Sequence, residues 1–374
     1  MTAPYSAAVA GYIKGSLEHI YTVTADPKLG ASFELPTEDA GLKVTLAEDW
    51  APHIQTSLTV PMLTQEQLDA LDPRTGARIQ ISAGYRYPDG TQDVHQLADL
   101  AVRLAEPAWP ANQVGINASS DEALAQDRMR VEANIGPFAF AGINEAVQFF
   151  ANYAVYPDTA VLSSSFAAGY GAASVAGLEV ATGTPMWSPI EDVAARAGVW
   201  VHCTPDRKWS ITPRPGLTTP AHVLTVGTDG TIITARAPLD RTQWANHVLT
   251  EYSWTDGAGA QQTVYGRAAV TSGRFSVNSA GYRTVKRTYT RPATQAQADA
   301  AAASRVRNLV SRGRGLTLEA HAAYWLRPGD TITVQLPLGP AENHVIKSIT
   351  FDPPAGLMSI QTRLPLDATI TTGE

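Results

Sequence analysis

Trp325-Leu-Arg-Pro-Gly-Asp330 is a turn that leads into the alternating run Thr331-Ile-Thr-Val-Gln-Leu336. Two further runs, His344–Phe351 and Leu357–Leu364, follow turns that are rich in Pro, Gly, Asn and Asp. Apolar side chains at every second position, with turn residues between the runs, are typical of antiparallel strands. The C-terminal part of the chain therefore predicts an antiparallel meander or a small barrel, which is a scaffold and not a catalytic site.

The same alternation occurs near the N-terminus, in the runs His19–Thr24, Leu42–Leu46, Gln55–Val60 and Arg78–Ala83. One short helix interrupts this series, since Thr64 and Gln67 form a capping box and Asp72-Pro73 ends the helix. Residues 94–104 fit the helical and the strand periodicity equally well. We assign residues 1–110 to an N-terminal domain that resembles a β-barrel.

Residues 111–220 predict a mixed α+β module. Short helices are expected after Ser119–Glu122 and over Asn144–Asn152, the latter with Val147, Phe149 and Phe150 pointing inward. Residues 158–184 are rich in Ser, Gly and Ala, which predicts a loop or a mobile flap.

The clearest helix start in this module is Ser188-Pro189-Ile190-Glu191. We expect Ser188 to cap the helix, Pro189 to occupy its first position and Glu191 to return the hydrogen bond. Gly198 is expected to end the helix. Trp200–Cys203 should then pair with Trp209–Thr212.

Strand patterns return after residue 220, in the runs His222–Val226, Thr231–Ala235, His247–Trp254 and Thr263–Val270. An Ala-rich helix is expected over residues 295–310, because Thr294 and Gln297 form a capping box and Gly313 follows. Residues 221–374 form the third expected domain, also barrel-like. The two β-rich regions, 19–105 and 221–364, could be distant copies of one barrel.

Composition limits the possible partners. The chain has 374 residues, of which 44% are hydrophobic and 17% charged, as in an ordered protein of two or three domains. A net charge of −7 argues against sequence-specific nucleic-acid binding, and the basic residues Arg283, Lys286, Arg287 and Arg291 fall on an alternating strand, where a solvated face is expected. No apolar run is long enough to span a membrane, and no signal peptide is visible, so we expect folding in a reducing cytosol.

Catalytic patterns are missing from the sequence. Histidines lack metal spacing, and the single Cys203 lies in an apolar strand, where a buried side chain is expected. Adjacent acids occur at turns or helix starts, where local roles explain them: Glu38-Asp39, Glu48-Asp49, Asp121-Glu122 and Glu191-Asp192. The eight tryptophans favour core filling over a sugar-binding platform. We therefore predict no catalytic, cofactor-binding or metal-binding residue, no cofactor and no enzymatic activity.

The order of these segments resembles the central hub, or minor tail, proteins at the tail tip of long-tailed bacteriophages, especially those of actinobacterial hosts. The similarity rests on four stretches of the sequence, namely Trp50–Val60 with Leu71–Gly76 and Gly84–Tyr87, Trp187–Gly198 with Trp209–Pro213, Asp240–Val248, and Leu326–Asp330 with Met358–Arg363. Each motif is short, and the order of the motifs carries the resemblance.

The resemblance implies two related barrels per subunit and a homotrimer with pseudo-sixfold symmetry. Such a trimer docks on a hexameric distal tail or tail-tube ring and contacts other tail-tip proteins and the tape measure protein, while the genome passes through its lumen. It implies a protein made in the host cytoplasm and located at the virion tail tip. Two other classes stay open, a receptor- or carbohydrate-binding tail protein with aromatic side chains grouped on one face, and a cell-wall hydrolase with a carboxylate cleft or a Cys203–His pair.

Overall fold

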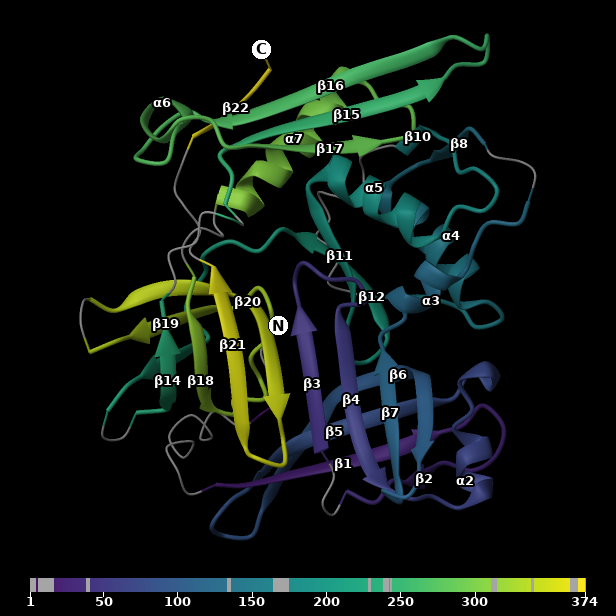
Figure 1. Cartoon of the computed structure of the whole chain (residues 1–374), viewed down its shortest axis with the longest axis vertical. Helices are drawn as coiled ribbons and strands as arrows, with labels where there is room; N and C mark the ends of the chain where they lie inside the picture. The colour runs from purple at the N-terminus through teal and green to yellow at the C-terminus, as the bar shows by residue number, and fades with distance from the viewer. Residues whose placement is uncertain are drawn as a thin grey trace.

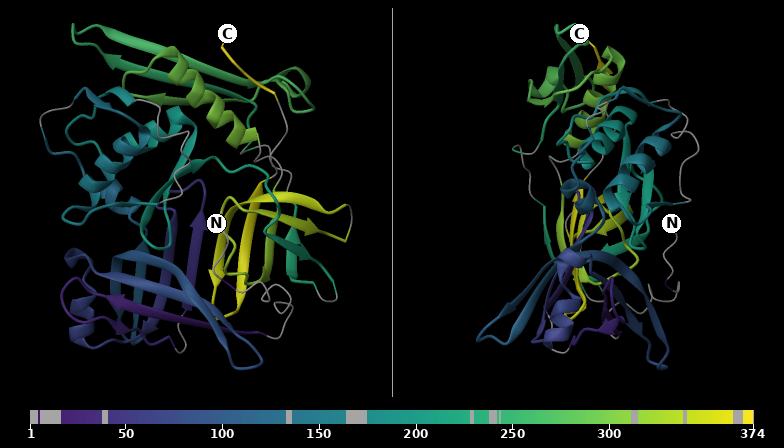
Figure 2. Two further views of the ribbon diagram at one scale, coloured as in Figure 1. Left: turned by 180° about the vertical axis from the view of Figure 1, so that it is seen from behind. Right: turned by 90° about the vertical axis from the view of Figure 1, so that its right-hand side faces the viewer.

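Antiparallel strands dominate the protein, and most of them belong to a 13-stranded sheet in the lower part of Figure 1. An α/β module and a smaller sheet with a long helix lie above it, and the molecule is thin in the view turned by 90° (Figure 2). The predicted fold class, mainly β with a smaller α+β part, is confirmed. The computed structural model describes residues 5, 17–37, 41–132, 136–163, 175–227, 230–237, 242, 244–310, 315–337, 340–363 and 369–373.

The first half of the large sheet contains the strands β1 (Glu18–Asp26), β3 (Gly41–Ala47), β4 (Ile54–Pro61), β5 (Arg78–Arg86), β6 (Gln92–Ala108) and β7 (Gln113–Ser119). Their order is β1-β5-β6-β7-β4-β3, with antiparallel neighbours throughout. The short β2 (Phe33–Glu34) extends the sheet beside β1. The run 94–104, which fitted both periodicities, is a strand and lies within β6.

The predicted capping box of Thr64 and Gln67 starts helix α2 (Gln65–Ala70), and the 3-10 turn η1 (Pro73–Thr75) follows.

The second half repeats this plan with β13 (His222–Thr225), β14 (Ile232–Arg236), β18 (Thr317–His321), β19 (Thr331–Gln335), β20 (Glu342–Asp352) and β21 (Leu357–Arg363). Taken in chain order, these strands correspond to β1, β3, β4, β5, β6 and β7. Their order in the sheet, β13-β19-β20-β21-β18-β14, is the order of the first half. One difference is that β13 runs parallel to β19, whereas β1 is antiparallel to β5.

A shared irregularity strengthens this correspondence. Strand β6 has an extra residue, Arg103, opposite β7, and β20 has one, Lys347, opposite β21. Both hairpins close with a four-residue turn, and the last turn residue, Asn112 or Gly356, has a positive φ of 53° or 66°. Bulges and left-handed turn residues are local choices that a strand order alone does not require. The two halves are therefore two versions of one structural unit.

Strand β20 joins the two halves into one sheet. Along one edge it pairs with β21, while its other edge is divided between two partners. Residues Glu342–Val345 pair with β19, and residues Ser348–Phe351 pair with Val44–Ala47 of β3. The change of partner occurs at the bulge, because the extra residue bends the strand away from β19.

An aromatic contact forms a second link between the halves. The hydroxyl of Tyr85 in β5 donates to the carbonyl of Ala322 at 2.7 Å and accepts from the amide of Tyr324 at 3.0 Å. The ring of Tyr5 packs against Tyr85 and against Trp325. Side chains of both halves consequently belong to one continuous hydrophobic core.

The α/β module lies to the right in Figure 1 and has its own core, which includes Phe150, Ile190 and Trp209. Its elements are α3 (Glu122–Asp127), β8 (Phe138–Phe140), α4 (Ile143–Val155), β9 (Val161–Leu162), β10 (Val175–Leu178), α5 (Trp187–Ala197), β11 (Val199–Cys203) and β12 (Lys208–Pro213). The predicted pairing of β11 with β12 is confirmed, and Gly198 ends α5 in a left-handed conformation.

Two details of this module were predicted wrongly. Helix α5 begins at Trp187 after Met186, so Ser188 is a helical residue and not the cap. Phe149 was expected to point inward, but its side chain is 41% exposed, since Val147 and Phe150 occupy the buried face of α4. The segment 158–184 contains β9 and β10, while its residues 164–174 lie outside the described residues.

The upper module is inserted between β14 and β18, except for its last strand, β22, which follows β21 in the chain. Its sheet has the order β17-β15-β16-β22, and α7 packs on it. Its elements are β15 (His247–Thr255), β16 (Gln261–Val270), α6 (Val277–Ala280), β17 (Thr284–Tyr289), α7 (Gln295–Val310) and β22 (Ile370–Thr372). Hydrogen bonds between Thr294 and Gln297 confirm the predicted capping box of α7, and the predicted end at Gly313 lies outside the described residues.

We expect Gly266→Ala in β16 to lower the free energy of unfolding by about 2 kcal/mol. A Cβ atom at this position would lie 2.1 Å from the carbonyl carbon and oxygen of Ala298 in α7, and these backbone atoms cannot rotate away. Gly257→Ala in the β15–β16 turn is the matched control, because a Cβ there meets open space. Chemical denaturation measures both variants, and equal midpoints would contradict the close approach of α7 to β16.

Candidate functional site

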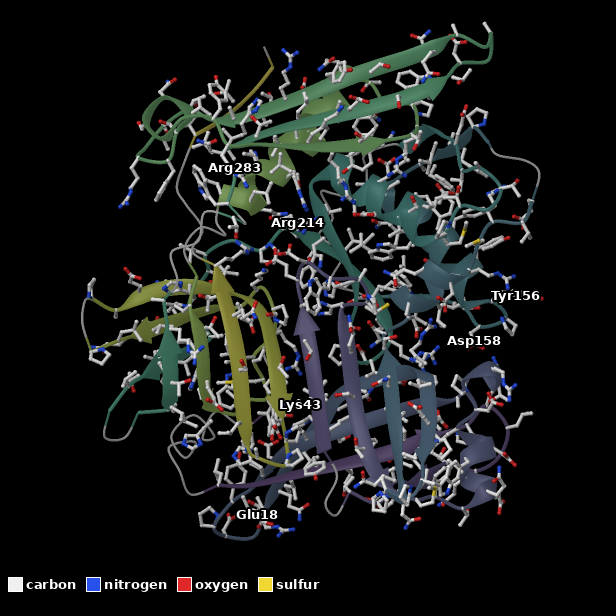
Figure 3. The ribbon with its side chains drawn as sticks, viewed as in Figure 1. Glu18, Lys43, Tyr156, Asp158, Arg214 and Arg283 are labelled. Carbon is white, nitrogen blue, oxygen red and sulfur yellow. The ribbon has the colours of Figure 1, made fainter. Side chains whose placement is uncertain are left out.

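A polar cavity of about 350 Å³ lies where the large sheet, the α/β module and the upper module meet. Its walls include Glu48 and Asp49 after β3, Trp200 in β11 and Arg305 in α7. Arg214, which follows β12, lies between the large sheet and the upper module in Figure 3. The cavity therefore marks the junction on which the relative position of all three parts depends.

A buried ion pair holds the lower side of this junction. The Glu48 carboxylate accepts from the Arg363 guanidinium at 2.9 and 3.0 Å, and Arg363 also donates to the carbonyl of Pro215 at 2.6 Å. Burial raises the pKa of Glu48 above its ordinary value, although Arg363 acts in the opposite direction. The pair connects the first half, the second half and the chain that leaves the α/β module.

Two buried histidines pack against Trp200, which lines the same cavity. Nδ1 of His53 lies 2.5 Å from the carbonyl oxygen of Ala47, and the ring of His53 meets the edge of Trp200. His202 stacks on Trp200 with ring centroids 3.8 Å apart and lies 4.9 Å from His53. Burial lowers the pKa of His53 to about 4 and that of His202 well below its ordinary value. Both rings are therefore neutral at pH 7.

Acid should weaken this junction. The unfolded chain protonates His53 near the ordinary pKa of about 6.5, whereas the folded chain does so near 4. The neutral His53 ring thus contributes to stability above pH 6.5, and this contribution is lost as the pH falls toward 4. The free energy of unfolding should decrease by about 2 kcal/mol between pH 7 and pH 5. Urea denaturation at both pH values should show a smaller loss for His53→Gln than for the natural chain. Equal losses would refute the assignment.

A second ionic network fixes the α/β module on the first half of the sheet. Arg78 in β5 binds Asp99 at 2.7 Å and Asp121 at 2.8 Å, and Asp121 also faces Arg207 in the β11–β12 turn at 3.4 Å. Glu122 accepts from the amide of Cys203 at 2.6 Å. Each contact joins residues far apart in the sequence, so the network stabilises the placement of the module.

Cys203 is buried, as predicted. Burial raises the pKa of its thiol well above the ordinary value, and the neighbouring Glu122 acts in the same direction. A thiol that stays protonated is a poor nucleophile. The arrangement therefore does not support the Cys203–His chemistry of a hydrolase.

A third ionic cluster connects the α/β module to the upper module. Asp192 in α5 is fully buried and faces Arg196 of the same helix at 2.5 Å and Arg291, which follows β17, at 3.1 Å. The expected solvated face holds for Lys286 and Arg287, whose side chains are each 52% exposed. It is wrong for Arg291, because this residue is the counter-charge of a buried carboxylate.

The predicted acid pairs consequently have structural partners. Glu48, Asp121 and Asp192 each come from a different pair and each bind arginine, while Glu38-Asp39 lies outside the described residues. Among the described residues, no group of three His, Cys, Asp or Glu side chains could hold a metal ion. Within the same ranges, no helix has the length and hydropathy that crossing a bilayer requires.

A separate groove of about 440 Å³ opens on the outer side of the α/β module. Val131, Phe149 and Tyr156 line it with exposed fractions of 70%, 41% and 71%. The guanidinium of Arg128 lies over the ring of Tyr153, 5.5 Å from its centroid. Tyr156 lies at the outer edge of the molecule in Figure 3. The sequence interpretation missed this groove because it placed Phe149 in the core.

The fold is similar to that of several solved tail proteins. The tail protein from Neisseria meningitidis MC58 is 12% identical, with a TM-score of 0.61, and the match covers 92% of this chain and 96% of that one. The 43 kDa tail protein of prophage MuSo2 from Shewanella oneidensis is 12% identical, with a TM-score of 0.58 and coverage of 92% and 98%. Prophage tail protein gp18 from Listeria monocytogenes EGD-e is 13% identical, with a TM-score of 0.51 and coverage of 92% and 94%.

Similarity to known proteins is detected in the structure and not in the sequence. No family model matches the chain, and no curated protein matches its sequence. The three tail proteins match over nearly their whole length, so the shared feature is the complete arrangement of modules. The chain has the fold of phage tail proteins.

Proposed function

We propose that this chain is the structural hub of a phage tail tip, which closes the tail tube and connects it to the distal tip proteins. The observation that carries the proposal is the pair of corresponding six-stranded halves, joined side by side through β3 and β20. Likeness in fold to phage tail proteins supports it. The protein acts by assembly and not by catalysis, in a virion made in the host cytoplasm.

The proposed hub is a homotrimer, and the two corresponding halves of the chain support this number. Three chains with two corresponding halves each present six similar faces, which fit a hexameric tail-tube ring above. The lower face is then available to other tip proteins, and the tape measure protein and the genome occupy the axis. An acidic chain suits such a passage, because a net charge of −7 disfavours adhesion of DNA. The division into residues 1–110, 111–220 and 221–374 stays a proposal, since the large sheet combines strands of the first and third ranges with β7, which lies in the second.

The oligomeric state tests this function. Light scattering of the purified chain should give about three times 39.8 kDa, alone or after addition of the tail-tube ring protein from the same phage. Electron microscopy of the particle should show a ring of six similar units, in which the first and second halves of the three chains alternate. A stable dimer or tetramer in both conditions would reject the trimeric hub. Release of soluble fragments from bacterial cell walls would favour the hydrolase instead.

The outer groove favours receptor binding as the second candidate. Its exposed aromatic side chains, Phe149 and Tyr156, and the cation of Arg128 beside Tyr153 form a surface that stacks on a sugar ring. Binding of host cell-wall glycans that is lost in Tyr156→Ala, with unchanged stability, would establish this function. No binding by the natural chain would exclude it for this groove.

A further inference from the structure

The tip of the β6–β7 hairpin, residues Trp109–Asn112, is apolar and exposed. It contains Trp109-Pro-Ala and no charged residue, and the side chain of Trp109 is 72% exposed. The turn between β5 and β6, in contrast, contains Asp89, whose carboxylate accepts hydrogen bonds from Thr91. Tryptophan is enriched among the residues that contribute most to protein contacts. The β6–β7 tip therefore has the composition of a contact surface.

The tip of the β20–β21 hairpin, residues Pro353–Gly356, holds the same place in the second half. The amide of Met62 donates to the carbonyl of Asn112 at 3.0 Å. In the same way, the amide of Ala322 donates to the carbonyl of Gly356 at 2.9 Å. Met62 and Ala322 are the first residues after the corresponding strands β4 and β18. This shared hydrogen bond aligns the two tips residue by residue.

The two tips differ in what covers them. In the alignment, Trp109 corresponds to Pro353, which is buried. Gly356 is also buried and lies against the first half, since a Cβ atom at this position would be 2.6 Å from Cδ2 of His19 in β1. The first strand of the first half thus covers part of the β20–β21 tip. An equivalent cover for Trp109 requires the second half of another chain.

We propose that the β6–β7 tip of one copy packs on the second half of a second copy, with Trp109 against the first strand of that half, β13. This inference rests on the trimeric hub proposed above and names one of its contacts. Figure 1 shows β6 and β7 at one end of the large sheet and β14, β18 and β19 at the other, so the contact is head-to-tail. Head-to-tail contacts close into a ring when their rotation allows it. In a ring of three chains, each of the six tips would be covered.

Strand β13 offers an apolar surface for this contact. Val223 in the strand is 54% exposed, and Val226, which directly follows it, is 39% exposed. Among the described residues, β13 pairs with β19 alone, so its other edge is open. Because β13 is parallel to β19 whereas β1 is antiparallel to β5, the repeat assigns the strand that meets Trp109 and not a single facing residue. Burial of apolar side chains on both sides can drive the contact.

Substitutions on both sides test the contact. Trp109→Ala should raise the concentration at half assembly, measured by light scattering, roughly thirtyfold or more. Val223→Asp should have a comparable effect, because it buries a charge without a partner. Trp50→Ala and Val161→Asp are the matched controls, since these side chains are 60% and 54% exposed, and both variants should assemble like the natural chain. All four side chains are exposed, so the midpoints of urea denaturation should stay unchanged.

Photo-cross-linking identifies the partner. The variant Trp109→benzoylphenylalanine should link to a peptide of a second copy that contains residues 222–226, alone or in the presence of the tail-tube ring protein. Trimers that form normally with Trp109→Ala and give no such link would overturn the contact and leave the hub intact. Links to another tail protein, or to a different part of the second copy, would also overturn it. Cross-linked dimers or ladders with the link at 222–226 would support the contact and reject the trimer, whereas a monomer in both conditions would reject both.

Discussion

Arg363→Met should lower the free energy of unfolding by about 3–5 kcal/mol. The guanidinium of Arg363 is bound to Glu48 at 2.9 and 3.0 Å, and both side chains are almost completely buried. Methionine fills a similar volume but leaves the Glu48 carboxylate without its counter-charge. The carbonyl of Pro215 loses a donor as well. The large loss of stability is thus due to an uncompensated buried charge at the junction and not to lost packing.

The double variant Glu48→Gln with Arg363→Met separates these causes. The double variant has no carboxylate at position 48, so no buried charge is left uncompensated. It should therefore be more stable than Arg363→Met alone. Urea denaturation at pH 7 with tryptophan fluorescence gives both values. If the double variant is the less stable of the two, the pair does not act through charge compensation.

Asp192→Asn should lower the free energy of unfolding by a similar amount, about 3–5 kcal/mol. The fully buried carboxylate faces Arg196 at 2.5 Å and Arg291 at 3.1 Å, and these side chains are only 8% and 14% exposed. The amide has almost the same shape but leaves two buried cations without compensation. Because the cluster joins α5 to the chain after β17, the loss should separate the upper module from the α/β module before the large sheet unfolds.

Hydrogen exchange can follow this separation. Amides of α5 and α7 should exchange faster in Asp192→Asn, while those of β4 and β7 keep their protection. The neighbouring Glu191→Gln is the control. Glu191 is half exposed and its ion pair with Arg287 is long, at 3.7 Å, so its loss should have a small effect on stability. Uniform loss of protection in all modules would show that the cluster stabilises the whole fold and not one contact.

Local patterns predicted most of the strands and the best helices. The alternating runs His19–Thr24 and Leu42–Leu46 lie in β1 and β3, because one face of each strand is buried in the common core. Capping boxes at Thr64 and Thr294 marked two helix starts correctly, since the reciprocal hydrogen bonds involve residues only three apart.

Long-range features were not visible in the same way. Arg291 and Asp192 are about a hundred residues apart, and nothing in either local pattern indicates that they share a buried site. The correspondence of the two hairpins is hidden because Trp109-Pro-Ala-Asn112 and Pro353-Pro-Ala-Gly356 share their length and a last residue with positive φ, but only two residue types. Phe149 is a related case. Helical periodicity identifies the apolar face of a helix, but it does not tell whether a side chain on that face packs in the core or lines a surface groove.

The upper module is inserted into one half only. In the second half, the connection between β14 and β18 carries the elements from β15 to α7, which are the long helix and all strands of the upper sheet except β22. The corresponding connection between β3 and β4 is the short loop 48–53. An assembly of three such chains would therefore offer six like positions on its sheet but bear only three protrusions. The assembly would then match a sixfold-symmetric partner on the side of the large sheet and a threefold-symmetric partner on the side of the upper module. A single polypeptide would thus join two rings of different symmetry.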